Sequence, residues 1–539
     1  MNDAAFTAAG AVVLLAGILA APRFPAAGTA IERALASRWA PVAVGAVAFL
    51  LFLWTWGGSF NPPPIFHDET AYLLQARIFA HFRWASPAAP LPEFFDQFHV
   101  FVTPALASKY PPGHSLLLVP GIWLGMPALM PLLLNAVSAA LLYILVRKLA
   151  GGGAALLAVA VWVTSSGVHL HLSTYFSENT TVALWLAGWW LILRWREDRR
   201  PWQLCALAAL VAWGGITRPL TMVVFAIPVG VVVLRDVVRG RRWRDLALAA
   251  AAGIVVCGIV PLWSWRTLGD WQVNPYPEYS RVYFPADRPG FGVDTTPPRR
   301  TLAPDQAQFL QIARERRAAY SPDDMPQAYA DRMRLLSRQF GFRWRKWLLV
   351  LAVAGLAVAP IPLWIAAGTG LLLTLAYLYF PHDPDWTLYY AEALPVVAAL
   401  IALGGWRVLR EYGRRATPGP AASAAQALLA AAAALALAIA SVPHLAIART
   451  IHTGRSRYFQ TFERRMAAIP DGKAVVFIRY APDHYLHWSL IRSEPDPATA
   501  RLWRVYDRGA DNERLMRAAP DRVPYLYDEA TGQVYRLPR

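Results

Sequence analysis

The feature that most constrains this chain is a series of about a dozen apolar runs whose lengths approach the thickness of a lipid bilayer. A bilayer core of about 30 Å is crossed by about 20 apolar residues in a helix. Lipid offers no partner to an open strand edge, so helices are the expected element. The runs are 5–21, 40–57, 128–146, 152–168, 180–193, 202–217, 219–234, 246–263, 347–360, 362–380, 388–406 and 421–443. The sequence therefore predicts a mainly α, polytopic membrane helix bundle of about 12 spans.

Composition supports this class and excludes several others. Of 539 residues, 56% are hydrophobic and 16% are charged, whereas soluble domains average roughly 25% charged residues. This balance excludes a disordered chain, a coiled coil and a typical cytosolic enzyme. Much of the net charge of +17 lies in short arginine clusters between apolar runs, which indicates membrane topology rather than a nucleic-acid partner. Cys205 and Cys257 lie in apolar runs, so no disulfide framework is expected.

The orientation follows from short basic loops. If the runs above are spans, these loops all fall on one side, which the positive-inside rule makes cytoplasmic. They are 147–148, 194–200, 235–245 and 407–415. The first outer loop (58–127), the large outer loop (264–346) and the tail then lie outside a bacterial inner membrane. The apolar run 114–126 is about a dozen residues long, too short to span, and is predicted to be interfacial or re-entrant.

The tail differs from the rest of the chain because polar residues return. Strands are predicted at 473–480, 502–507 and 523–528, a short helix at 512–520 and a last strand at 534–537. This pattern is typical of a small α/β domain. The predicted organisation is a transmembrane domain over 1–445 followed by a small extracytoplasmic domain over 446–539.

The first outer loop opens with three prolines and then an acidic pair, Asp68 and Glu69, beside His67. Apolar residues recur at 74, 78 and 82, the spacing of a helix lying in the interface plane. Asp68 has two interpretations. It is either the N-cap of that helix or a general base whose pKa is raised by partial desolvation at the membrane surface.

Farther along the same loop, Lys109 stands alone before a double-proline break and the short apolar run. One interpretation is a snorkelling lysine at the interface. The other is a clamp on a phosphate, for which an ammonium works as a point charge.

These motifs together resemble the GT-C glycosyltransferases, which include the protein O-mannosyltransferases and the lipid-A aminoarabinose transferases. The resemblance rests on the acidic pair, the interfacial helix, the lysine–proline motif with its apolar run, and the segment FHVFVTPALASKYPPG (98–113). It covers the membrane part and is strongest over 61–220. One departure is that Tyr110 separates Lys109 from the prolines, where the family has lysine directly before proline.

The resemblance implies an inverting transfer of a sugar from a polyprenyl-phosphate carrier to an extracytoplasmic acceptor, which is an envelope glycan, lipid or protein. Asp68 corresponds to the catalytic carboxylate that deprotonates the acceptor hydroxyl. Glu69 orients the acceptor or tunes Asp68 by like-charge coupling. Cations near the leaving phosphate favour the transition state. A phosphate leaving group needs no general acid, unlike an inverting hydrolase.

Further candidate substrate-binding residues lie near the outer ends of later spans. Glu178 is either a solvated residue beside a helix cap or a second acidic site residue, as the family has in this loop. Arg218 either snorkels or contacts the lipid phosphate, because an arginine at membrane depth is a functional hypothesis by default. His382 and Tyr390 lie near the outer mouth, where an aromatic belt also explains the tyrosine. No cofactor is expected, since His67, His382 and Asp383 show no tight metal-ligand spacing.

Two other functions compete with the enzyme. A transporter or flippase of a lipid-linked saccharide would carry ionisable residues near the middle of its spans. A non-catalytic envelope-assembly protein would depend on its tail and tolerate Asp68→Asn. The clustering of carboxylates in outer loops favours the glycosyltransferase.

Overall fold

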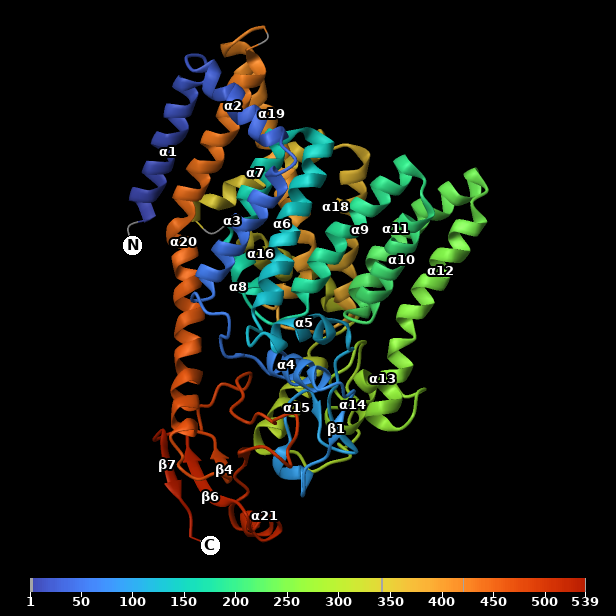
Figure 1. Cartoon of the computed structure of the whole chain (residues 1–539), viewed down its shortest axis with the longest axis vertical. Coiled ribbons are helices and arrows are strands. Elements are labelled where there is room, and N and C mark those ends of the chain that lie inside the picture. Colours follow the sequence, from blue (N-terminus) through green and yellow to red (C-terminus); the bar gives the residue numbers. More distant parts are fainter. Residues whose placement is uncertain (1–2, 341–342, 420, 539) are drawn as a thin grey trace.

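The computed structural model describes residues 3–340, 343–419 and 421–538 and is mainly helical (Figure 1). Each predicted apolar run falls on a helix, or on a pair of short helices. The bundle helices are α1 (Asp3–Ala20), α2 (Pro25–Ala36), α3 (Ala40–Thr55), α6 (Leu129–Ala150), α7 (Gly152–Val163), α8 (Ser166–Leu172), α9 (Glu178–Asp198), α10 (Pro201–Gly215), α11 (Pro219–Gly240), α12 (Trp243–Cys257), α13 (Ile259–Leu268), α17 (Leu348–Ala357), α18 (Ile361–Ala376), α19 (Leu394–Ala416) and α20 (Ala422–Ala467).

Several of these helices are long and apolar enough to cross a membrane. Within the described residues 7 helices or helix pairs meet that test, or up to 9 if each strongly bent pair is one span. The bent pairs are α2 with α3, at 86°, and α7 with α8, at 65°. A multi-pass membrane bundle is therefore confirmed, whereas the predicted count of about 12 is not.

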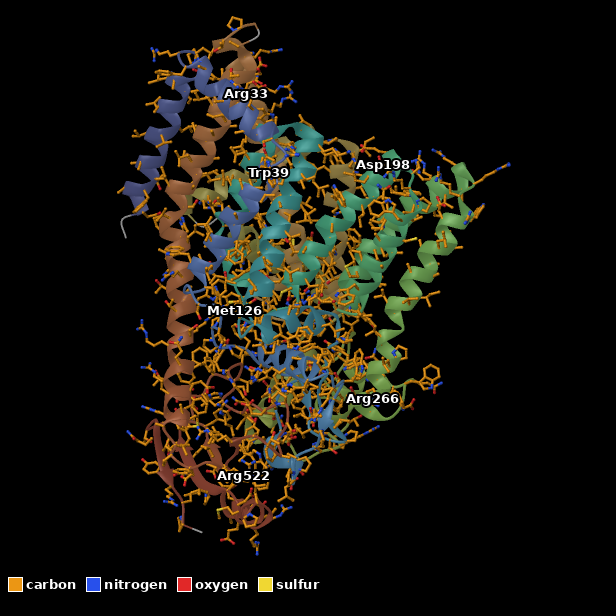
Figure 2. All side chains as sticks on the ribbon, in the orientation of Figure 1. Arg33, Trp39, Met126, Asp198, Arg266 and Arg522 are labelled. Carbon is orange, nitrogen blue, oxygen red and sulfur yellow. The ribbon has the colours of Figure 1, made fainter. Side chains whose placement is uncertain are left out.

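Ion pairs show that the predicted basic loops share one end of the bundle. Lys148 Nζ lies 2.5 Å from Glu197 Oε1. Asp236 Oδ2 lies 3.1 Å from Arg196 Nε and 2.8 Å from Arg199 Nη2. Asp198 lies at this end in Figure 2, away from Arg522 in the C-terminal region. Three of the four basic loops thus lie together, and their cytoplasmic assignment stays a prediction.

The first outer loop forms short elements that lie across the other end of the bundle (Figure 1). They are α4 (His67–Ala80), β1 (Ser86–Pro87), β2 (Val100–Phe101), β3 (Ala105–Ser108) and α5 (Gly113–Trp123). The 11 residues of α5 are too few to span a bilayer.

Helix α4 corrects one prediction, because it does not lie with an apolar face in lipid. Leu74 is 2% exposed and Ile78 is 0% exposed, so protein encloses that face. Phe82 lies beyond the end of the helix and is 86% exposed. The helical spacing was right, but the rest of the protein supplies the apolar surface that the prediction assigned to the membrane.

The large outer loop is also helical and packs beside α4. It contains α14 (Pro275–Tyr283), α15 (Pro304–Ala318) and α16 (Met325–Phe340). Buried rings of this loop contact the first outer loop: Phe98 stacks on Phe284, the residue after α14, with ring centroids 5.6 Å apart, and meets Phe309 of α15 at 5.5 Å. The two outer loops therefore form one layer over the end of the bundle.

The C-terminal region forms the predicted small α/β unit. Its strands are β4 (Ala474–Arg479), β5 (Leu502–Tyr506), β6 (Val523–Asp528) and β7 (Gln533–Arg536), in the order β5-β4-β6-β7, with α21 (Asn512–Ala518) between β5 and β6. Strand β4 pairs in parallel with β5 and β6, and β7 is antiparallel to β6. Helix α20 runs unbroken from 422 to 467 into this unit, so no helix end marks the predicted division at 445/446, which stays a prediction.

Candidate active site

The start of α4 is held by Glu69 rather than by Asp68. Phe66 is the N-cap, so the N-cap interpretation of Asp68 is wrong. Glu69 Oε2 accepts hydrogen bonds from the backbone N–H groups of Ile65, at 2.7 Å, and Phe66, at 3.0 Å. Its Oε1 accepts from the N–H of Tyr175 at 2.9 Å. With three donors, the buried Glu69 ties the first outer loop to the loop before α9, which favours a positioning role over the predicted catalytic one.

Asp68, in contrast, presents its carboxylate to an accessible surface. Its side chain is 40% exposed. Oδ1 accepts a short hydrogen bond from the Tyr110 hydroxyl, and Oδ2 lies 3.8 Å from His99 Nε2. Burial holds the pKa of His99 well below its usual value, so this ring is neutral. Asp68 therefore keeps an unneutralised carboxylate oriented by one phenol, which suits a proton acceptor.

Lys109 shares the Tyr110 side chain with this carboxylate as a neighbour and is buried in a cage of tyrosine rings. Its Nζ is 5.3 Å from the ring centroid of Tyr110, 5.0 Å from that of Tyr276 and 5.1 Å from that of Tyr279. Within residues 3–340, 343–419 and 421–538, no carboxylate oxygen lies within 4.0 Å of Nζ. Burial lowers the pKa of Lys109, while Asp287 and Asp68 oppose that shift. Lys109 is only 3% exposed, so the snorkelling interpretation is wrong.

Arg218 and Glu178 come together, but they neutralise each other. Arg218 Nη1 lies 2.5 Å from Glu178 Oε1, and its Nη2 donates to the Tyr377 hydroxyl at 2.8 Å. A second carboxylate, Glu392 Oε1, lies 3.9 Å from Arg218 Nε. Glu178 is 1% exposed, so the solvated alternative is wrong. With two carboxylates beside it, the predicted contact of Arg218 to a lipid phosphate has less support than that of Lys109.

This network reaches the acidic pair through tyrosines. Tyr72 of α4 donates to Ser177 Oγ at 3.0 Å, and Ser177 lies next to Glu178. The ring of Tyr72 stacks on Tyr110 with centroids 4.6 Å apart, and Tyr110 donates to Asp68. Asp68, Lys109 and Glu178 therefore belong to one continuous cluster.

The two predicted histidines make structural contacts. His67 Nε2 lies 2.6 Å from the carbonyl oxygen of Leu486 in the C-terminal region, and burial lowers its pKa to about 3. His382 Nε2 lies 2.9 Å from the Tyr390 hydroxyl, and burial lowers the pKa of His382 to about 3 as well. Tyr390 and His382 are thus hydrogen-bonded to each other. No contact within the described residues joins either of them to Asp68. Within the described residues, no group of three His, Cys, Asp or Glu side chains is placed to hold a metal.

Sequence reasoning missed several members of the cluster. Tyr276 and Tyr279 come from the large outer loop, and Glu392 comes from the short 3-10 helix η5 (Thr387–Ala393). None has a local signal, since tyrosines and a lone glutamate near spans are common. Only Tyr110 was visible in advance, as the residue that interrupts the family's lysine–proline motif.

Fold and site together describe a multi-pass membrane protein that carries a carboxylate and an ammonium in one cluster at one end of a helical bundle. A family model described as "Dolichyl-phosphate-mannose-protein mannosyltransferase" matches residues 126–265. This match confirms, over that segment, the predicted resemblance to the GT-C glycosyltransferases. The segment includes Glu178 and Arg218 and stops short of Asp68 and Lys109.

Solved structures of three membrane glycosyltransferases are similar to this chain. ArnT from Cupriavidus metallidurans, bound to undecaprenyl phosphate, matches with TM-score 0.48 and 14% identity, over 92% of this chain and 91% of that chain. The oligosaccharyltransferase of Archaeoglobus fulgidus with a tethered acceptor peptide gives 0.41 and 14%, over 88% and 64%. The arabinofuranosyltransferase AftD from Mycobacteria gives 0.44 and 15%, over 87% and 32%. No protein of curated function matches the sequence.

Proposed function

We propose that this protein is an inverting glycosyltransferase that moves a sugar from a polyprenyl-phosphate carrier to an acceptor on the extracytoplasmic face of a bacterial inner membrane. The observation that carries the proposal is that a partly exposed carboxylate, Asp68, and a buried cation, Lys109, lie in one cluster, and that no carboxylate of the described residues forms an ion pair with Lys109. Tyr110 joins them by bonding Asp68 and lining the lysine cage. The tyrosine rings attract the ammonium, but its burial is unfavourable, and a bound anion would offset that cost.

The chemistry follows from the charges. Asp68 takes the proton of the acceptor hydroxyl as that oxygen attacks the anomeric carbon. The bond between the anomeric carbon and the phosphate oxygen breaks, the lipid phosphate leaves with both electrons, and the configuration inverts. Lys109 stabilises the negative charge that grows on the leaving phosphate, more in the transition state than in the ground state. The Tyr110 hydroxyl holds Asp68 Oδ1, which leaves Oδ2 to accept the proton.

The test is transfer by the full-length protein reconstituted in liposomes with a lipid extract that contains polyprenyl-phosphate sugars. We expect Asp68→Asn to abolish product formation while binding of undecaprenyl phosphate, the lipid of the ArnT structure, persists. Glu93→Gln is the matched control, because that partly exposed carboxylate of the first outer loop pairs with Arg514 and lies outside the cluster. Normal turnover by Asp68→Asn would refute the proposal. Movement of the lipid-linked sugar across the bilayer without transfer would support the flippase instead.

A further inference from the structure

A loop of the C-terminal region reaches back to the start of α4. In Figure 1 this orange-red segment extends from the sheet toward α4 and α15. The Leu486 carbonyl contacts His67, as described above, and Trp488 forms an antiparallel bridge with Phe66. His484 braces the loop, because its Nδ1 lies 2.8 Å from Glu529 Oε1 and its Nε2 lies 3.0 Å from the Trp488 carbonyl oxygen. The loop 484–488 is therefore fixed beside the residue that precedes Asp68.

This contact brings His487 to the same face as Asp68. Burial lowers the pKa of His487, and the Asp68 carboxylate is the strongest group opposing that shift. Asp383 and Asp385, on the segment between α18 and α19, also oppose it, whereas Arg316 of α15 reinforces it. His487 thus stands among three carboxylates from two separate segments, of which Asp68 has the strongest effect.

Aromatic rings surround His487. The Trp386 ring meets the His487 ring nearly edge-on, at 82° and 5.6 Å between centroids. The Tyr485 ring centroid also lies 5.6 Å from that of His487, and Tyr485 is 52% exposed. Arg316 lies over the Trp386 ring at 5.1 Å and pairs with Asp383 at 2.6 Å. The result is a partly exposed set of rings, in which Tyr485 is the exposed member, edged by one arginine and several carboxylates.

We propose that Trp386, Tyr485 and His487 form the acceptor surface of this enzyme and that the acceptor is a saccharide. The proposal rests on the glycosyltransferase function argued above and names its acceptor class. Flat rings cover the apolar C–H faces of a pyranose, while carboxylates and a guanidinium bind its hydroxyl groups. Recognition of a peptide by strand addition would need a free strand edge, and neither segment 380–387 nor segment 484–488 contains a strand. The C-terminal region thereby completes the site instead of being an appendage.

The test uses a strain from which the gene for this protein is deleted and in which the full-length chain or a variant is expressed. Labelling is done in cells, and the apparent KM is measured with membranes prepared from them. Cells receive a radiolabelled sugar, and the labelled envelope product is divided by protease digestion and by glycosidic-linkage analysis. We expect label in a glycosidic linkage that resists protease. Tyr485→Ala combined with His487→Ala should raise the apparent KM for the acceptor about tenfold or more, the factor that the loss of one or two ring contacts gives. Binding of undecaprenyl phosphate should not change.

Tyr535→Ala is the matched control, since this tyrosine of β7 is 47% exposed in the same C-terminal unit but lies outside the ring set. Normal acceptor KM in the double variant overturns the acceptor surface, while loss of transfer in Asp68→Asn still supports the enzyme. Label on serine or threonine of protein overturns the saccharide and assigns a peptide acceptor. Transfer that persists in Asp68→Asn overturns the proposed function itself, a result distinct from the other two.

Discussion

The two neighbouring carboxylates at the start of α4 should respond in opposite ways to loss of charge. Glu69→Gln keeps one oxygen, which can still accept from Ile65 and Phe66, but its amide NH₂ then faces the N–H of Tyr175. The N–H of Tyr175 then loses its acceptor and faces the NH₂ of the glutamine, another donor. This should lower the free energy of unfolding by about 1–3 kcal/mol. Glu69→Ala strands all three N–H groups and costs more, although the terms do not add fully. Asp68→Asn removes no buried acceptor of a backbone group and leaves the side chain partly exposed, so unfolding should change by less than about 1 kcal/mol.

The assay is thermal unfolding of each detergent-purified variant, followed by transfer activity at a temperature where all variants are folded. Glu69→Gln should lower the unfolding midpoint and retain most of its activity once folded. Asp68→Asn should keep the midpoint and lose transfer. Amide exchange should quicken at Tyr175 in the Glu69 variant alone, because that N–H loses its acceptor. A Glu69→Gln protein of normal stability that has lost transfer as fully as Asp68→Asn would refute the positioning role and restore Glu69 to the chemistry.

Three more perturbations separate charge from packing. Lys109→Met should raise the unfolding midpoint of the lipid-free protein, because it removes a buried cation that no carboxylate in the described part of the chain pairs with. The same change should weaken undecaprenyl-phosphate binding at least about tenfold, as vesicle co-sedimentation would show. Arg218→Gln leaves Glu178 and Glu392 without their cation and should cost about 3–5 kcal/mol in unfolding, with Glu178→Gln in the same chain recovering part of it; no loss of stability would contradict the network. Asp96 lies between two arginines, yet burial raises its pKa to about 7. Because the folded pKa lies above the unfolded value of about 3.9, the contribution of Asp96 to stability is full below about pH 3.9 and is lost as pH rises through about 7. Asp96→Asn should therefore flatten this part of the pH profile of the free energy of unfolding.

The positions of the helices could be predicted because, in lipid, the backbone N–H and C=O groups of each apolar run must form hydrogen bonds within that run. A run such as 128–146 or 219–234 forms a helix in lipid whatever its neighbours are, so hydropathy is enough to find it. The strands of the C-terminal unit were visible for a similar reason, since alternating apolar residues between turns suit a half-buried sheet. The count of spans was less accessible, because a bend such as that between α7 and α8 leaves no clear mark on hydropathy.

The membership of the site depended on contacts between distant segments. Asp68 and Lys109 were found because they stand beside proline breaks in one loop and share a family's pattern. His487 and Tyr276 were not found, because nothing near them in sequence tells a site residue from an ordinary surface aromatic. The apolar face of α4 was misassigned to lipid for the same reason: its spacing shows that one face is apolar, not what covers it.

By itself the sequence determined that much of this protein lies in a lipid bilayer and that its spans are helices. Both follow from local properties of the chain, its hydropathy and the need of each backbone group for a hydrogen bond in lipid. It also determined which carboxylates and cations stand near the ends of the bundle. The tertiary structure alone decided which charges remain available for chemistry. Glu69 accepts hydrogen bonds from three backbone N–H groups, and Arg218 lies beside two carboxylates. Asp68 stays partly exposed, and no carboxylate among the described residues pairs with Lys109. The electrostatic free energy of a charged side chain depends on the groups that pack around it. Those groups come from distant segments, so no single segment of the sequence predicts them.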